Sequence, residues 1–261
     1  MSDSGFSRRR FIKSAGIAGA MTGLAASPVL AKQTQTVSNQ DKGLRFLFQG
    51  DSITDGNRGR NADPNHILGH GYVFAIGSRV GADFPRAGFS FYNRGISGDK
   101  VPDLERRWQK DTLDLKPDVL SLLVGINDVG AIVNKNPEAQ DLAQFESGYR
   151  NLLAQSKAQN PNILFVLGLP WVFPVGARKE NFDLWKDKVL ARAEVVKKLG
   201  EVFNAILVDF PAVFERAMKE APIDYWIWDG IHPRVFGHEL MAREWIKQVS
   251  SRLEFLNDYN Y

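Results

Sequence analysis

Five short apolar runs alternate along this chain with amphipathic stretches. The apolar runs have the length of buried strands, and the stretches between them show helical periodicity. The apolar runs lie at 44–49, 89–93, 119–124, 163–169 and 205–209. The amphipathic stretches lie at 72–80, 101–115, 142–158, 181–199 and 237–255. Strands that alternate with helices predict a parallel sheet with helices on both faces. Right-handed crossovers then give an α/β fold, a three-layer α/β/α sandwich around a five-stranded parallel sheet.

The first 31 residues have the pattern of an export signal. Ser-Arg-Arg-Arg-Phe-Ile-Lys at 7–13 is a twin-arginine pattern, a weakly apolar run follows at 15–26, and small residues at 29–31 suit cleavage. A disordered basic tail and a membrane anchor are the alternatives, but the run is too short to span a bilayer stably. We therefore expect a twin-arginine signal peptide at 1–31 and a periplasmic or secreted protein without stable membrane insertion after cleavage.

Removing this segment changes the charge of the chain. Residues 1–31 carry four of the 33 basic and one of the 30 acidic residues, which leaves 29 of each. A balanced chain has no whole-molecule field for nucleic acid or anionic membrane, so we expect no nucleic-acid partner. The lack of cysteine excludes disulfides and a thiol nucleophile. We expect a polar leader at 32–42 and one domain at 43–261, long enough to build its own core.

Small polar residues and glycines follow the apolar runs. They cluster at 50–52, 93–99, 125–128 and, beyond the last run, 228–233. The carboxyl ends of parallel strands meet at one edge of a sheet, where such folds bind their ligands. Each cluster by itself is compatible with a turn or a cap. Ser52 could be a nucleophile, or it could be a helix N-cap, because Ser and Asp are preferred caps.

Together the four clusters resemble the sequence blocks of the SGNH hydrolases, a branch of the GDSL-type esterases and lipases. The matching blocks are 50–53, 96–98, 125–128 and 229–233, in the family's order, with Ile53 where many members have Leu. The resemblance covers nearly the whole mature chain. It implies a flavodoxin-like SGNH hydrolase fold and a serine esterase that works through an acyl-enzyme and needs no cofactor. It also favours the nucleophile interpretation of Ser52 over the cap.

The resemblance implies a role for each residue of the site. A serine hydroxyl needs a base to become a good nucleophile, and His232 is the candidate base for Ser52. Asp229 can orient the imidazole and stabilise the imidazolium that forms. The donors to the developing oxyanion are the backbone N–H groups of Ser52 and Gly98 and the side-chain amide of Asn127. The alternative for Asp229 and His232 is a local hydrogen-bonded turn.

Within the superfamily the chain is most similar to acetyl-xylooligosaccharide esterases and related carbohydrate deacetylases. The similarity lies in residues 50–55, 68–73, 93–98 and 228–229. It implies hydrolysis of acetyl esters on a small-molecule or oligosaccharide substrate. Alternatives are a lipase, lysophospholipase or thioesterase on the same fold, and a noncatalytic carbohydrate-binding relative, which a missing Ser, Asp or His would have favoured. The loops at 55–69 and 170–181 match no pattern and are expected to set specificity; the oligomeric state stays open.

Two aromatic residues beside the closing block are candidate substrate contacts. Trp226 and Trp228 could pack in the core, or one of them could form a flat stacking wall for a sugar ring. Tyr225 adjoins them and shares both alternatives. A local hydrogen-bonding role is expected for Asp51 and Asp128, which adjoin the site.

The other histidines could indicate a metal site. His66 and His70 stand four residues apart, near Asp63. They belong to a loop rich in Gly and Asn without a His-Glu-x-x-His pattern, so we expect no metal. His238 is expected at the start of the last helix, with a structural role.

Overall fold

The computed structural model describes residues 37–61 and 63–259. The predicted signal peptide at 1–31 and the first part of the predicted leader lie outside these residues. The end of the leader, 38–42, forms a turn in which Ser38 Oγ donates to Asp41 Oδ2 at 2.7 Å. The next residue, Gly43, donates its N–H to the carbonyl of Ala87 at 2.7 Å. Among the helices of the described residues, none is long and apolar enough to cross a membrane.

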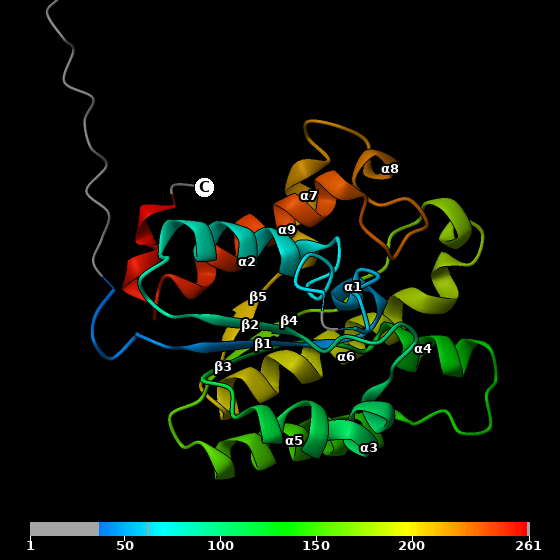
Figure 1. Cartoon of the computed structure of the whole chain (residues 1–261). Helices are drawn as coiled ribbons and strands as arrows, with labels where there is room; N and C mark the ends of the chain where they lie inside the picture. The colour runs from blue at the N-terminus through cyan, green and yellow to red at the C-terminus, as the bar shows by residue number, and fades with distance from the viewer. Residues whose placement is uncertain (1–36, 62, 260–261) are drawn as a thin grey trace, which may run out of the picture. The chain divides into compact units, whose positions relative to one another are not determined.

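A five-stranded sheet forms the middle layer, with the strand order β2-β1-β3-β4-β5 (Figure 1). Its strands are β1 (Arg45–Gly50), β2 (Ser90–Asn93), β3 (Val119–Leu123), β4 (Leu164–Gly168) and β5 (Ile206–Val208). Every pairing is parallel, and β1 lies between β2 and β3, with Phe48 opposite Asn93 on one side and Ser121 on the other. The five predicted strands are confirmed, each end within one residue of its expected position.

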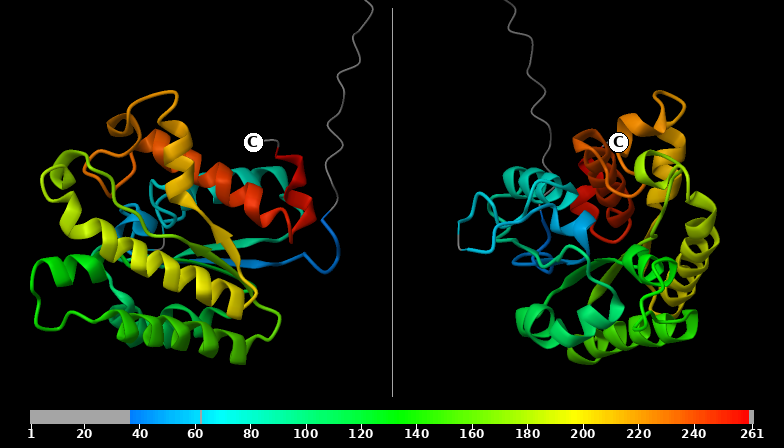
Figure 2. Two further views of the ribbon diagram at one scale, coloured as in Figure 1. Left: turned by 180° about the vertical axis from the view of Figure 1, so that it is seen from behind. Right: turned by 90° about the vertical axis from the view of Figure 1, so that its right-hand side faces the viewer.

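Helices cover both faces of this sheet, so the predicted three-layer sandwich is confirmed (Figures 1 and 2). One face carries α2 (Tyr72–Asp83), α7 (Phe210–Ala217) and α9 (Val235–Val249). The other carries α3 (Val101–Asp111), α5 (Leu142–Gln159) and α6 (Phe182–Val202). Side chains of β1 alternate between the two cores: Phe46 and Phe48 pack with α2 and α9, and Leu47 packs with α3 and α5.

Each core contains a fully buried tryptophan whose ring nitrogen has a partner. Trp245 Nε1 donates to Ser121 Oγ at 3.1 Å on the α9 face. Trp108 Nε1 donates to Ser156 Oγ at 3.1 Å on the α3 face. A buried N–H without an acceptor would cost free energy, so these serines let the two large rings fill the core.

Four helices were not predicted from the sequence. They are α1 (Ser52–Asp55), α4 (Ile126–Val133), α7 and α8 (Ile223–Trp226). Helices α1 and α8 are single turns, too short to show a period of 3.6 residues. Helix α4 begins inside a polar cluster, and α7 follows β5 after one residue, the N-cap Asp209.

Two predicted helices were too long. The stretch at 101–115 contains α3 and then a separate 3₁₀ turn, Leu113–Leu115, because the chain leaves helical geometry at Thr112 (φ −134°, ψ −63°). The last helix begins at Val235 and ends at Val249, and a second 3₁₀ turn, Glu254–Asp258, follows. A third 3₁₀ turn, Gly176–Arg178, lies in the loop between β4 and α6.

Candidate active site

Ser52 is the first residue of α1, directly after β1. The N-cap of this helix is Asp51, whose Oδ1 accepts a hydrogen bond from the Ile53 N–H at 3.0 Å. The interpretation of Ser52 as the cap is therefore wrong. Glycine is required at position 50, because a Cβ there would lie 2.2 Å from the carbonyl oxygen of Leu123. This close approach of Gly50 to β3 places Ser52 directly after the carboxyl end of β1, at the edge of the sheet.

The side chains of Ser52, His232 and Asp229 form one hydrogen-bonded chain. Ser52 Oγ lies 2.7 Å from His232 Nε2, although 180 residues separate them. The other ring nitrogen, His232 Nδ1, lies 2.7 Å from Asp229 Oδ2. These two distances are in the range at which a base can take the hydroxyl proton while a carboxylate holds the ring.

Asp229 also forms the local turn that the sequence offered as an alternative. Its second oxygen, Oδ1, accepts the backbone N–H groups of His232 at 2.7 Å and Ile231 at 2.9 Å. One carboxylate oxygen therefore fixes the turn and the other orients the imidazole. The two interpretations describe different oxygens of the same side chain.

These contacts set the protonation of the pair. Burial by itself raises the pKa of Asp229, but hydrogen bonds from the His232 ring and from the two backbone N–H groups outweigh it and lower the pKa to about 2. The hydrogen bond to Asp229 raises the pKa of His232 above its ordinary value, against the effect of burial. Asp229 is thus ionised at neutral pH, where it can stabilise a protonated imidazole.

Neighbouring segments hold the turn in place. Residues Ile227 and Pro233 form an antiparallel bridge, and the Trp228 N–H donates to the His232 carbonyl at 3.1 Å. The buried Trp171, in the loop that connects β4 to α6, donates its Nε1 proton to the Ile231 carbonyl at 2.9 Å. Trp171 belongs to the loop that matched no sequence pattern, and no signal in the sequence pointed to this contact.

The predicted oxyanion donors lie on two further strand-end segments. Gly98 has a φ of +89°, a conformation that residues with a Cβ rarely adopt, and it is exposed. Asn127 lies in the first turn of α4, and its amide donates to the Asp99 carbonyl at 3.2 Å. Within the described chain, the backbone N–H groups of Ser52 and Gly98 donate to no other group. Both N–H groups are free to bind a substrate oxygen.

Asp55, at the end of α1, connects the serine segment to the glycine loop. Its carboxylate is nearly buried and accepts two hydrogen bonds from Ser97, one from the backbone N–H and one from Oγ, both at 3.0 Å. Arg60 approaches the same carboxylate with two nitrogens, at 2.7 and 3.0 Å. Burial raises the pKa of Asp55, but the bonds from Arg60 and Ser97 lower it below its ordinary value overall. No role could be expected for Asp55 from the sequence alone, although it is the last residue of the block 50–55.

Two other carboxylates brace the site as expected. Besides capping α1, Asp51 is fully buried, and burial raises its pKa to about 7. Asp128 Oδ1 accepts the Val101 N–H at the start of α3 at 3.1 Å, and burial raises its pKa to about 6. Both side chains fix the start of a helix next to a predicted site residue.

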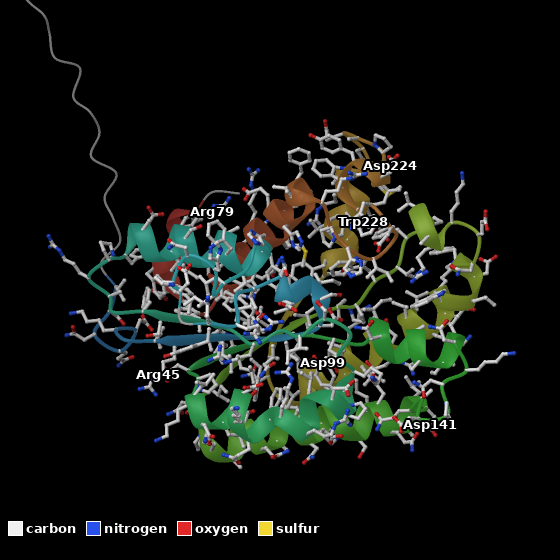
Figure 3. All side chains as sticks on the ribbon, turned by 45° about the vertical axis from the view of Figure 1, so that its right-hand side comes forward. Arg45, Arg79, Asp99, Asp141, Asp224 and Trp228 are labelled. Atoms are coloured by element: carbon white, nitrogen blue, oxygen red, sulfur yellow. The ribbon has the colours of Figure 1, made fainter. Side chains whose placement is uncertain are left out.

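The aromatic residues near the closing block are placed differently from one another. The Trp228 ring, labelled in Figure 3, is 55% exposed. It is stacked beside the His232 ring, with 6.2 Å between the centroids. The Trp226 ring is partly buried, and its Nε1 donates to the carbonyls of Ala217, the last residue of α7, and Ala221, in the segment between α7 and α8. Tyr225 is exposed and stacks on Phe236, in the first turn of α9. Of these rings, Trp228 is the one in contact with the predicted base.

The remaining histidines lie outside this hydrogen-bonded chain. His66 Nε2 is 3.5 Å from Asp63, and the His66 and His70 rings are 6.5 Å apart. In residues 37–61 and 63–259, no group of three or more His, Asp and Glu side chains is arranged to hold a metal ion. His238 lies in the first turns of α9 and accepts the Tyr72 N–H at 3.3 Å. Burial lowers its pKa to about 4, so it stays neutral.

Known proteins resemble this chain in sequence and in fold. Residues 48–240, which include every predicted site residue, match the family model described as GDSL-like Lipase/Acylhydrolase. An acetylxylan esterase of Geobacillus stearothermophilus is 32% identical over 212 residues, which cover 79% of this chain and 94% of that protein. A crystal structure of an acetylxylan esterase from that organism has a TM-score of 0.69 and 31% identity, covering 80% of this chain and 94% of that one. A crystal structure from Parabacteroides merdae, assigned to the GDSL-like lipases, has a TM-score of 0.76 and 37% identity, covering 80% and 97% of the two chains.

Proposed function

Since the chain belongs to the GDSL-like Lipase/Acylhydrolase family and is a carboxylic ester hydrolase, we propose that it removes acetyl groups from carbohydrate. The observation that carries the proposal is the unbroken hydrogen-bonded chain from Ser52 through His232 to Asp229. The similarity to acetylxylan esterases supports the acetyl-sugar substrate.

In the proposed acylation step, Ser52 Oγ attacks the ester carbonyl while His232 Nε2 takes the hydroxyl proton. The carbonyl oxygen becomes negative and accepts hydrogen bonds from the N–H groups of Ser52 and Gly98 and from the Asn127 amide. The tetrahedral intermediate then breaks its bond to the sugar oxygen, which leaves with the proton from His232. Ser52 now carries the acyl group, and the first product is an alcohol.

Deacylation repeats the sequence with water as the nucleophile. His232 takes a proton from the water as it attacks the acyl carbon and returns it to Ser52 Oγ when the acid leaves. Asp229 remains ionised and stabilises the imidazolium in both steps, in keeping with its pKa of about 2. The step consumes one water and restores the free hydroxyl.

Trp228 is the residue proposed to contact the sugar. Its ring is exposed beside His232, and an aromatic face suits the apolar face of a pyranose. Trp226, predicted as a second contact, is assigned instead to packing of α8 against α7, because its two hydrogen bonds go to Ala217 at the end of α7 and to Ala221 just beyond it. A lipase, lysophospholipase or thioesterase would instead need space for a long acyl chain.

A series of acyl esters tests the substrate. We expect kcat/KM to fall from acetyl to butyryl to octanoyl esters, because each methylene that does not fit the acyl pocket costs roughly 1–3 kcal/mol. Release of acetate from acetylated xylooligosaccharides, with a lysophospholipid assayed in parallel, completes the test. A rate that rises toward octanoyl, with no acetate from any sugar, would assign the chain to the lipases.

Export is the second part of the proposal. The twin-arginine pattern at 7–13 would direct the folded chain across the inner membrane, leaving the domain that begins near residue 43 in the periplasm or outside the cell. Replacing Arg8, Arg9 and Arg10 with lysine should leave uncleaved precursor in the cytoplasm. Normal processing of that variant would argue for another route.

A further inference from the structure

We propose that a cavity beside the outer strand β2 binds an oxyanion, the carboxylate or phosphate group of a small ligand. The cavity has a volume of about 280 Å³. Its lining includes three arginines, Arg58, Arg60 and Arg94, together with Asn61, Ile67 and Asp111. Arg58 and Arg60 belong to the surface loop between α1 and α2, which Figure 2 shows from two sides.

The carboxylates near this cavity are already paired with other groups. Asp55 accepts hydrogen bonds from Arg60, from Ser97 and from the backbone N–H of Arg58. Asp111 lies 3.3 Å from Arg107, whose Nε also donates to Asp99 at 2.7 Å (Asp99 is labelled in Figure 3). The lining still has an excess of positive charge, because it contains three arginines and one carboxylate, Asp111, which also pairs with Arg107.

Arg58 and Arg94 keep donors available for a ligand. Arg58 uses its Nε to donate to the Gly95 carbonyl at 2.9 Å. Arg94 uses one terminal nitrogen, which donates to the Asn93 carbonyl at 3.3 Å. Among the described residues, their other guanidinium N–H groups donate to no protein acceptor. A planar fork of N–H donors fits the two oxygens of a carboxylate or phosphate.

The crowding of these cations favours an anion between them. Arg58 is half-buried, and its pKa is lowered to about 10 by burial and by the charges of Arg60 and Arg94, which outweigh the opposing charges of Asp55 and Asp111. Removing a cation from water next to like charges costs free energy, and an oxyanion placed between the guanidinium groups offsets that cost. A neutral ligand would not offset this cost.

The cavity is also connected to the proposed active site. The Arg58 bond to Gly95 fixes the beginning of the loop that carries Gly98. Arg60 reaches the same loop through Asp55 and Ser97. The anion has two possible sources: a free anion such as phosphate, or an acidic sugar on an acetylated glycan. The second source rests on the proposed function, and the first does not.

Thermal unfolding of the full chain tests the anion site without any turnover. Sodium phosphate and sodium glucuronate are compared with sodium chloride at equal ionic strength. At ten times the dissociation constant, we expect either oxyanion to raise Tm by about 3–5 °C over chloride. The rise should be lost in Arg94→Gln and kept in Arg252→Gln, whose guanidinium donates to Asn204 outside the cavity lining.

A second variant covers the case in which Arg94→Gln does not fold. Asn61→Asp adds a carboxylate to the exposed lining and keeps all three arginines. It should raise Tm in chloride and abolish the response to phosphate and glucuronate. Two results would overturn the proposal. One is a rise in Tm of the wild type with phosphate or glucuronate that is no larger than with chloride. The other is a rise in both variants, Arg94→Gln and Asn61→Asp, that equals that of the wild type.

Activity assays distinguish the two sources. The ratio of kcat/KM for acetylated xylooligosaccharides with and without a glucuronic acid substituent is measured in wild type and in Arg94→Gln. A tenfold drop of the ratio in Arg94→Gln supports the acidic sugar as ligand. If the ratio is the same in wild type and Arg94→Gln, and phosphate no longer raises the Tm of Arg94→Gln, the ligand is a free anion. If no acetyl-sugar is hydrolysed, the proposed function fails, while the Tm result still decides the anion site.

Discussion

Replacing Asp55 with asparagine tests whether the glycine loop must be tied to the serine helix for catalysis. In the wild type, the buried Asp55 carboxylate accepts two hydrogen bonds from Ser97, next to Gly98. Hydrogen bonds to a charged group contribute about 1.5–3 kcal/mol each. The contact with Arg60, whose side chain is 52% exposed, contributes less than about 1 kcal/mol. Asparagine keeps one acceptor oxygen, so we expect a loss of about 2–4 kcal/mol in the free energy of unfolding.

Asp55→Asn should lower kcat more than it changes KM. A displaced Ser97 moves the Gly98 N–H, and loss of one oxyanion donor lowers the rate by about 10²–10³-fold. For a loosened loop we expect kcat to fall by about 10–100-fold with little change in KM. Steady-state kinetics on an aryl acetate and urea unfolding of the same samples give both numbers.

Asp118→Asn is the matched control. Asp118 also accepts a backbone N–H, that of Arg45 at 2.9 Å, but it stands at the amino end of β3, away from the site. The Asp118→Asn variant should lose about 1 kcal/mol in the free energy of unfolding, with kcat unchanged. A folded Asp55→Asn protein with wild-type kcat would refute the reasoning, since Asp55 would then serve stability alone.

Asn127→Ala should lower kcat by about 10²–10³-fold and change KM much less, because its amide serves mainly the developing oxyanion; a change in KM alone would make it a binding residue. The rate should rise with pH as His232 loses its proton, with a midpoint above the ordinary 6.5, because the bond to Asp229 raises the pKa of His232. Asp229→Asn should move that midpoint to lower pH and reduce kcat by about 10³–10⁴-fold, and an unmoved midpoint would contradict the assigned pairing. Trp228→Ala should raise KM for an acetylated oligosaccharide more than for a small aryl acetate, and equal effects would argue against sugar stacking.

The strands could be predicted because their signals are local, whereas the roles proposed for the site residues came from the resemblance of four sequence blocks to the SGNH hydrolases. Each strand is a short apolar run with a turn after it, and parallel pairing brings the ends of these runs to one edge. The three-residue spacing of Asp229 and His232 is likewise sufficient for one turn to place both side chains. The structure added the distance: the hydroxyl of Ser52, 180 residues away, lies 2.7 Å from the His232 ring.

Other features could not be predicted, because they depend on tertiary contacts. Asp55 looks like any short-loop carboxylate until Ser97 and Arg60 are seen around it. Trp226 and Trp228 differ by two residues and have the same side chain, yet one packs on α7 and the other stacks on His232. Periodicity also fails for single turns such as α1, whose start is fixed by a cap and a glycine.

Covalent labelling of the serine tests the central claim most directly. The purified mature chain is treated with an organophosphonate that reacts with activated serine hydroxyls, and the labelled residue is located by peptide mass spectrometry. We expect one label, on Ser52, with esterase activity lost in proportion to labelling, and no label or activity in a folded Ser52→Ala variant. Label on a different residue, or undiminished turnover by folded Ser52→Ala, would contradict the account.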